Sequence, residues 1–293
     1  FFSSNDRIAI AGVPIQTLDQ QKATREEYLA YLRQVVRVRD LVVRTFEEVT
    51  DVDRDGDGFT VLTTRAGDRA TRYRSGRVVL AVGDMHAPRR LDIPGEDLPH
   101  VSHYFEEPHR HFGRRLLVVG CRNSAVEAAL RCHHAGAWVA ISCRHASFDD
   151  RRVKAWLLPE LRNRIGAGEI DAHLATRPLA ISPDSVTLQA EAGATRDVPA
   201  DDVLLLTGYV ADPTLLRRAG VGLAGEQRAP VHDPATMQTE VPGLYVAGTA
   251  TAGSQTSHAV FIENCHVHAA RIAAHVAGRA VPEADVAPER PES

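Results

Sequence analysis

The chain has 293 residues, of which 44% are hydrophobic and 25% charged, and its formal net charge is −4. This composition indicates an ordinary soluble globular protein with room for more than one core, and it argues against a nucleic-acid partner. No apolar run approaches the ~20 residues of a membrane span, and the first residues lack a signal-peptide pattern. The four cysteines form no Cys-x-x-Cys pair, so neither a disulfide framework nor a zinc site is indicated. We therefore expect a cytoplasmic protein with no membrane partner.

The first hundred residues predict one helix followed by short strands. Thr24 and Glu27 form a capping-box pattern. The helix that follows would carry an apolar face made of Leu29, Leu32, Val35 and Val36. We predict strands at residues 41–45, 48–52, 59–64 and 77–82, the last of which ends at Gly83.

An acidic stretch between two of these strands resembles the start of a calcium loop. Asp53, Asp55 and Asp57 alternate before Gly58, but Thr64 stands where such a loop needs a bidentate Glu. A hairpin turn is the better interpretation.

The most informative stretch is residues 116–144, which predicts a β-α-β unit. Residues 116–119 are an apolar run typical of a buried parallel strand, and Gly120 turns the chain. Asn123 or Ser124 is expected to cap the following helix, and residues 138–142 form the second strand. Such a corner binds the pyrophosphate of a dinucleotide, because backbone N–H groups and the helix N-terminus both face it.

The dinucleotide fingerprint at this corner is imperfect. Gly120 and Ala125 fit the first and last positions of Gly-x-Gly-x-x-Gly/Ala, but Arg122 occupies the middle one. Arg122 would either swing aside and pair with a phosphate or weaken binding. No acidic residue follows the second strand to accept a ribose hydroxyl, whereas Arg144 suits a 2′-phosphate, so the sequence favours NADPH over NADH. The alternative is a β-α-β unit that binds nothing.

The second half of the chain alternates strands with helices. We predict a helix or turn at 153–166, strands at 170–176, 186–190, 203–209 and 243–248, a helix at 260–276 and a disordered tail at 281–293. His103, at the Pro- and His-rich crossing, would contact nicotinamide or substrate, or else pack in a hinge. No Cys or carboxylate at recognised spacing completes a metal site beside the His pairs 109/111 and 266/268, so we expect no metal.

Five short motifs follow one another in a recognisable order. They are Leu-Ala-Val-Gly83, Pro94-Gly-Glu-Asp97, Val-Val-Gly120, Leu-Thr-Gly-Tyr209 and Tyr-Val-Ala-Gly248. This order resembles that of two-domain flavoprotein pyridine-nucleotide-disulfide oxidoreductases of the thioredoxin reductase type. Within that group the chain is most similar to the YpdA-type bacillithiol-disulfide reductases, through residues 1–4, 101–105, 123–130, 153–159 and 261–264.

The resemblance implies two cofactors, NADPH and FAD, and a small-molecule disulfide or other electron acceptor. It also implies a homo-oligomer. On the NADPH side it implies contacts from Gly120, Arg122, Asn123, Ser124, Ala125, Arg144, His145 and Gly208. On the FAD side it implies contacts from Gly83, Gly248, Thr249, Phe261 and Ile262, with a helix N-terminus near Phe261 facing the flavin.

The chain departs from the family pattern in several places. The family's first β-strand, Gly-rich turn and helix, together with a Cys proposed to contact the thiol substrate, would precede Phe1, so we expect an incomplete flavin domain that binds FAD poorly. Thr249 stands where many relatives have Asp, and Cys265 where the subgroup has Gly. Cys265 is a candidate redox residue if the helix dipole lowers its thiol pKa, and otherwise a small buried residue. Cys121 and Cys132 are expected to be structural.

The predicted fold is α/β, with two Rossmann-like three-layer domains. The NADPH domain, residues 104–212, is inserted into an FAD domain formed by residues 1–103 and 213–280, ahead of the tail at 281–293. The predicted function is an FAD-dependent oxidoreductase that passes hydride from NADPH to flavin and on to a small disulfide. A flavin monooxygenase and a non-catalytic NADPH-binding remnant are the alternatives.

Overall fold

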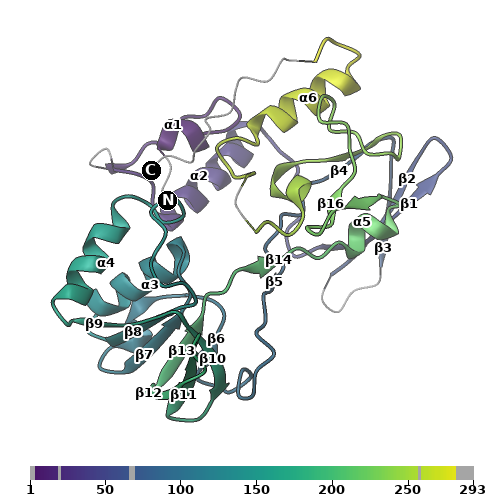
Figure 1. Cartoon of the computed structure of the whole chain (residues 1–293). Helices are drawn as coiled ribbons and strands as arrows, with labels where there is room; N and C mark the ends of the chain where they lie inside the picture. The colour runs from purple at the N-terminus through teal and green to yellow at the C-terminus, as the bar shows by residue number, and fades with distance from the viewer. Residues whose placement is uncertain (1–3, 19–20, 66–69, 257–258, 282–293) are drawn as a thin grey trace. The chain divides into compact units, whose positions relative to one another are not determined.

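The computed structural model describes residues 4–18, 21–65, 70–256 and 259–281 (Figure 1). The chain forms two compact units, which divide between Ala87 and Pro88 and between Gly208 and Tyr209. From the sequence we predicted domain boundaries at 103/104 and 212/213. These boundaries, and the nucleotide that each segment binds, stay predictions. The predicted tail lies almost wholly outside the described residues. Within the described part of the chain, no helix has the length and apolar character needed to cross a bilayer.

The unit of residues 88–208 is built around a five-stranded parallel sheet in the order β6-β13-β7-β8-β9. The strands are β6 (Val101–Ser102), β7 (Arg115–Val119), β8 (Trp138–Cys143), β9 (Ile170–Leu174) and β13 (Asp202–Leu205). Helices α3 (Asn123–His134) and α4 (Leu157–Gly166) pack on one face. The antiparallel strands β10 (Thr176–Ile181), β11 (Ser185–Ala190) and β12 (Thr195–Pro199) cover the other, as Figure 1 shows. A short 3-10 helix, η2 (Pro108–His111), precedes β7.

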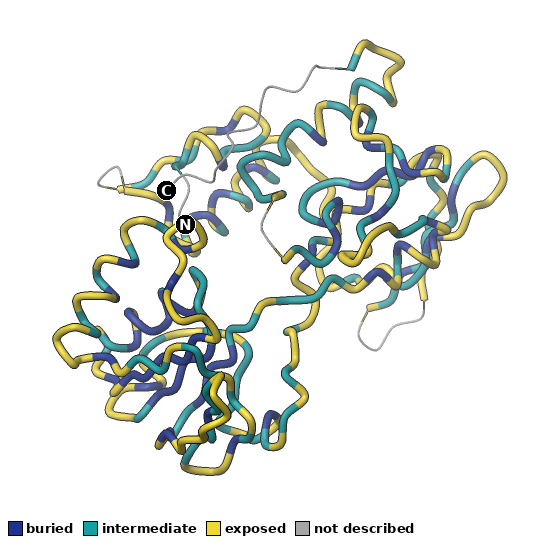
Figure 2. Tube along the Cα trace, in the orientation of Figure 1, coloured by how far each residue is buried: buried dark blue, intermediate teal, exposed yellow. Residues whose placement is uncertain are grey.

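Strand β7 alternates its side chains between the two cores of this unit. Leu116 and Val118 pack with the helices, whereas Leu117 and Val119 pack against the antiparallel strands. This is the period of two expected for a strand, and both faces are apolar because both are covered. Figure 2 shows the buried residues gathered along β7, β8 and α3. The run at 116–119 therefore folds as predicted.

The second unit contains a helical cluster and an antiparallel sheet. Its first elements are α1 (Asn5–Ile8), α2 (Arg25–Val38), β1 (Glu48–Asp55), β2 (Gly58–Thr64), β3 (Thr71–Ser75) and β4 (Val78–Leu80). The Thr24–Glu27 capping box is present, as predicted. Strands β1 and β2 pair Asp55 with Gly58, so the acidic stretch is a hairpin turn, as predicted.

After residue 208 the chain returns to this unit. The later elements are α5 (Thr214–Arg218), β15 (Leu223–Ala224), β16 (Ala229–Pro230), β17 (Leu244–Val246), η3 (Gly248–Ala252) and α6 (His266–Val276). Strand β17 pairs in parallel with β4, so the predicted strands ending near Gly83 and Gly248 lie side by side. Two further short strands, β5 (Ala87–Pro88) and β14 (Tyr209–Val210), pair at the crossings of the chain.

One predicted strand and the start of one predicted helix are wrong. Residues 41–45 form no strand, and Val42 and Phe46 are 85% and 95% exposed, because the described part of the chain offers this segment no neighbouring strand. The helix predicted from residue 260 begins only at His266. The Asn264 side chain accepts from the Phe261 N–H (2.9 Å) and donates to the Ala259 carbonyl (2.8 Å), and these local bonds hold a turn in place of the first helical turn.

Gly95, in the segment of residues 91–98, packs closely against β10 within the unit of residues 88–208. Its φ is +82°, and a Cβ there would lie 1.9 Å from the Ile181 carbonyl oxygen. We predict that Gly95→Ala lowers the free energy of unfolding by about 2–4 kcal/mol, since it adds a backbone clash to left-handed strain. Chemical denaturation measures this. Gly168→Ala is the control, because Gly168 has φ +72° but open space around it. Equal losses in the two variants would contradict the clash.

Candidate functional site

The predicted phosphate turn lies at the carboxyl ends of three neighbouring parallel strands. Strands β7, β8 and β13 end at Val119, Cys143 and Leu205. The Gly120 N–H donates to the Ser142 carbonyl at 2.9 Å, which fastens the turn to β8. Ligands of open parallel sheets bind in the crevice outside this edge. The turn therefore stands where a dinucleotide phosphate would be held.

Gly120 is required at this turn. Its φ is +149°, and a Cβ would lie 2.6 Å from the Leu206 carbonyl oxygen and 2.8 Å from the Ala125 Cβ. Ala125, at the last fingerprint position, lies in the first turn of α3 and is buried in the core between this helix and the sheet. The two small residues thus allow helix and strand to approach closely, which is the role that the fingerprint assigns to them.

The start of α3 differs from the prediction. Arg122 is the N-cap residue and makes no side-chain cap bond, so neither Asn123 nor Ser124 caps the helix. The Asn123 carbonyl Oδ1 instead accepts from the Lys154 N–H at 2.8 Å, which ties the helix start to the segment before α4. Ser124 is exposed in the first turn.

Positive charge is concentrated around this turn. Burial and the neighbouring guanidinium groups of Arg152, Arg144 and Arg89 lower the pKa of Arg122, which nevertheless keeps its charge at neutral pH. Arg144 follows β8 directly, is exposed, and donates from Nε to Nε2 of His145 at 3.3 Å. Arg144 was predicted from its place after the strand; Arg89 and Arg152 were not, because they are distant in sequence.

The remaining predicted residues of this unit lie close to the same edge. The His145 carbonyl accepts from the Ala175 N–H (2.9 Å), and the Gly208 carbonyl accepts from the Arg89 N–H (2.8 Å). Gly208 has φ +102°, where the chain leaves β13. Their contacts with a nucleotide remain predictions.

In the other unit, three of the residues predicted to contact FAD come together at the ends of β4 and β17. A Cβ on Gly83 would lie 3.9 Å from the Thr249 Oγ1, and both Gly83 and Gly248 have positive φ. The Gly248 N–H donates to Nδ1 of His268 at 3.1 Å. The imidazole therefore accepts at Nδ1, and this N–H already has a partner.

Sequence reasoning missed three polar residues here. Besides His268, buried Asp84 accepts from Gln255 at 2.9 Å, and Gln255 Oε1 accepts from the N–H groups of Ala259 and Val260. Gln255 therefore holds the segment that leads to α6. Only the position of Asp84, directly after Gly83, could have signalled this contact.

The other residues predicted to face the flavin have structural partners. The Ile262 side chain packs against the apolar cluster of α1 and α2. Phe261 precedes a turn, because the helix N-terminus expected near it lies at His266. Cys265 is the N-cap of α6, and its Sγ lies 3.5 Å from the Ile262 carbonyl oxygen. Burial raises the pKa of the Cys265 thiol, which is the reverse of what the dipole argument required.

Three buried polar atoms, on α6 and just before it, test whether this unit fits a cofactor. Glu263 Oε1, His266 Nε2 and Arg271 Nε are buried without a hydrogen-bond partner among the described residues. Buried polar groups are normally satisfied, so each of these atoms could take a polar ligand group as its partner. With the glycine pair at Gly83 and Gly248, these residues fit a nucleotide such as FAD.

His103 has a structural partner. Its Nε2 lies 2.8 Å from Oε1 of Glu96, which is buried and also accepts from the N–H groups of Leu91 and Asp92. Burial opposes ionisation of Glu96, but these bonds and Arg90 together hold its pKa below the ordinary value. This network favours the packing interpretation of His103.

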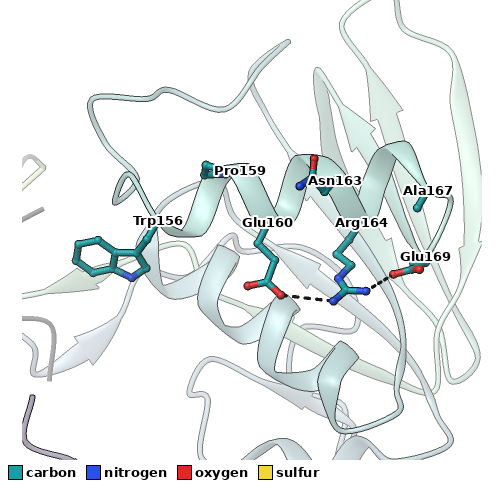
Figure 3. Close-up of a pocket in the computed structure, with 7 residues that line it drawn as sticks. All are labelled: Trp156, Pro159, Glu160, Asn163, Arg164, Ala167 and Glu169. Carbon is teal, nitrogen blue, oxygen red and sulfur yellow. Dashed lines mark hydrogen bonds and ion pairs between the residues drawn. The ribbon is translucent and has the colours of Figure 1, made fainter. Parts of the chain in front are cut away.

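A surface hollow on the outer side of α4 contains none of the predicted site residues (Figure 3). Its lining residues are Trp156, Pro159, Glu160, Asn163, Arg164, Ala167 and Glu169. Arg164 pairs with Glu169 at 2.7 Å and with Glu160 at 3.8 Å, so its charge is already balanced. We assign no chemistry to this hollow.

Comparisons with known proteins agree with this arrangement. The family model of pyridine nucleotide-disulphide oxidoreductases matches residues 2–248. Bacilliredoxin reductase Bdr of Bacillus subtilis is 32% identical over 279 residues, covering 95% of this chain and 84% of the relative. The solved bacillithiol disulfide reductase Bdr (YpdA) of Bacillus cereus is 33% identical, with a TM-score of 0.89 and coverage of 95% and 85%. Its Staphylococcus aureus counterpart is 32% identical, with a TM-score of 0.86 and coverage of 95% and 84%.

The buried His268 predicts a pH dependence of stability. Burial, with Arg271 and His232 nearby, lowers its pKa to about 4, against about 6.5 in an unfolded chain. Below pH ~6.5 the unfolded chain takes up a proton that the folded chain resists, so this contribution is present above that pH and is lost as the pH falls towards ~4. We expect His268→Asn, which keeps an acceptor near Nδ1, to flatten this part of the stability profile. Exposed His109→Asn is the control and should leave the slope unchanged.

Proposed function

The chain belongs to the pyridine nucleotide-disulphide oxidoreductase family, and on this premise we propose that its acceptor is a bacillithiol-type disulfide. The chain is an FAD-dependent oxidoreductase that uses NADPH to reduce a small disulfide. Which disulfide it reduces is the part that we propose. The proposal is supported by the similarity to the two solved bacillithiol disulfide reductases, which are 33% and 32% identical and cover 95% of the chain.

The arginine cluster is the observation that best supports NADPH as the electron donor. Arg122 and Arg144 stand at the carboxyl edge of the sheet, together with Arg89 and Arg152. We propose that Arg144 holds the 2′-phosphate, because it directly follows β8, where NAD-binding units place an acidic residue. Arg122 would pair with the pyrophosphate across the turn at Gly120.

The residues at the ends of β4 and β17 would hold FAD. Gly83 and Gly248 offer close backbone approach, and Thr249 offers a hydroxyl. At the start of α6, Glu263 and His266 offer polar atoms that lack hydrogen-bond partners within the described part of the chain. When bound, FAD supplies the redox chemistry, and the protein supplies position, electrostatics and exclusion of water.

Homo-oligomer formation and a cytoplasmic location stay predictions that rest on the resemblance and the composition. A flavin monooxygenase and a non-catalytic remnant were the alternatives. No feature of the described site favours either over a disulfide reductase.

An anaerobic titration of the purified, FAD-loaded chain tests the function. We expect NADPH to bleach the flavin absorbance, and a stoichiometric addition of bacillithiol disulfide to restore it. Oxidised glutathione, added in place of bacillithiol disulfide, is the control that shows whether the acceptor site selects among small disulfides. Bleaching by NADPH that only oxygen reverses, with a hydroxylated product, would favour a monooxygenase instead.

Arg144→Gln tests the assignment of the 2′-phosphate. A lost bond between charged groups costs about 1.5–3 kcal/mol, so we expect the Kd for NADPH to rise roughly 10- to 100-fold. The Kd for NADH should change little, because NADH lacks this phosphate. Exposed Arg177→Gln, on β10, is the charge-matched control. An equal loss of affinity for both nucleotides would show that Arg144 contacts a part of the cofactor other than the 2′-phosphate.

A further inference from the structure

Two of the cysteines lie together at the base of the phosphate turn. Cys121 follows Gly120, and Cys143 is the last residue of β8. Strands β7 and β8 pair Val119 with Ser142, so the residues that follow leave the sheet side by side. The two thiols are close enough to hydrogen-bond with each other. Cys121 is half-buried and Cys143 is fully buried, and both are free thiols.

The surroundings give the two thiols different chemistry. The Cys143 thiol donates to the sulfur of Cys121, and this bond, helped by Arg144 and Arg122 against the effect of burial, lowers the pKa of Cys121 to about 6. The same bond and burial raise the pKa of Cys143. Cys121 is thus the attacking thiol of the pair, and Cys143 is the resolving thiol.

The other two cysteines provide a contrast. Burial raises the pKa of Cys132 to about 12, and it also raises the pKa of Cys265. Neither has a second thiol beside it. Reactive cysteines occur in electropositive, partly exposed surroundings, and among the four only Cys121 meets that description.

We propose that Cys121 and Cys143 form a redox-sensitive pair that a low-molecular-weight disulfide oxidises, and that the oxidised pair weakens NADPH binding. The second half of this proposal rests on the proposed function, because it takes the arginine cluster as the NADPH site. The oxidant belongs to the class of molecule that the enzyme reduces. The pair would therefore respond to accumulation of the acceptor.

The oxidation proceeds by two exchanges. The Cys121 thiolate attacks one sulfur of the disulfide RSSR, the S–S bond breaks, and a mixed disulfide forms as one thiolate RS⁻ leaves. Cys143 gives up its proton and attacks the Cys121 sulfur, which releases the second RS⁻. Two protein thiols are oxidised to one disulfide, and one RSSR is reduced to two thiols.

The geometry explains why this bond would disturb the turn. A disulfide holds its sulfurs about 2.05 Å apart, much closer than two hydrogen-bonded thiols. Gly120 is already in tight contact with Leu206 and Ala125, so the main chain cannot shift freely on that side. The adjustment falls on Cys121 and on its neighbour Arg122, which belongs to the arginine cluster. Loss of the Cys121 thiolate leaves the guanidinium groups more positive, so the weaker binding comes from the displacement of Arg122 and not from the change in charge.

The experiment uses the full-length, fully reduced protein with oxidised glutathione as the disulfide. Peptide mass spectrometry should find Cys121 linked to Cys143, and fluorescence titration should give an NADPH Kd about tenfold weaker that dithiothreitol restores. Cys143→Ser, which keeps a donor beside Cys121, should trap glutathione on Cys121, and Cys121→Ser should form no adduct at either position. Cys132→Ala is the control and should behave as wild type.

Several outcomes would overturn the proposal. Glutathione recovered on Cys265 or Cys132, or wild-type protein that forms neither a Cys121–Cys143 disulfide nor an adduct on Cys121, would show that the two cysteines are not a reactive pair. A Cys121–Cys143 disulfide with an unchanged Kd for NADPH would show that oxidation of the pair does not weaken NADPH binding. Reduced protein that does not bind NADPH at all would instead count against the proposed function, while the peptide map would still decide whether the pair forms. Mapping the wild-type protein does not depend on any variant folding.

Discussion

The close contact at Gly120 is the constraint on which the nucleotide-binding unit depends. The Leu206 carbonyl, at the end of β13, and the Ala125 methyl, in the first turn of α3, leave no space for a side chain at this position. The contact brings strand, turn and helix together at one edge of the sheet. It also fixes where Arg122 emerges, and therefore where the positive charge is concentrated. The overall charge of −4 conceals this local excess of guanidinium groups.

The two ends of the proposed electron path are built differently. At the NADPH end, charge dominates, and exposed or half-buried arginines surround a turn of small residues. In the unit proposed to hold FAD, several backbone and polar groups already have partners: His268 accepts from Gly248, and Gln255 links Asp84 to the segment before α6. A mobile, charged substrate suits the first arrangement and a resident cofactor suits the second, because a preorganised polar surface loses little entropy when it binds.

The features that the sequence predicted well are those decided by neighbouring residues. The run at 116–119 and the turn at Gly120 lie within one β-α-β unit, and the Thr24 capping box lies within one helical turn. Arg89 and Arg152 were missed because only the folded sheet brings them to Arg122. Residues 41–45 have strand propensity, but the described residues provide no neighbouring strand for them, and propensity alone does not show whether a partner strand exists. The start of α6 was misplaced because Asn264 uses its side chain to hold a turn that apolar periodicity does not reveal.

The order of the strands in space has a consequence for synthesis on the ribosome. Strand β13 lies between β6 and β7 but comes last of the three in the chain, so the parallel sheet of residues 88–208 cannot be completed until its final strand has left the exit tunnel. Strands β4 and β17 are separated by that whole unit and must pair later still. The inserted unit can therefore fold first, while the segment before residue 88 waits for its partner. During that interval the nascent chain exposes strand edges that a chaperone would be expected to protect.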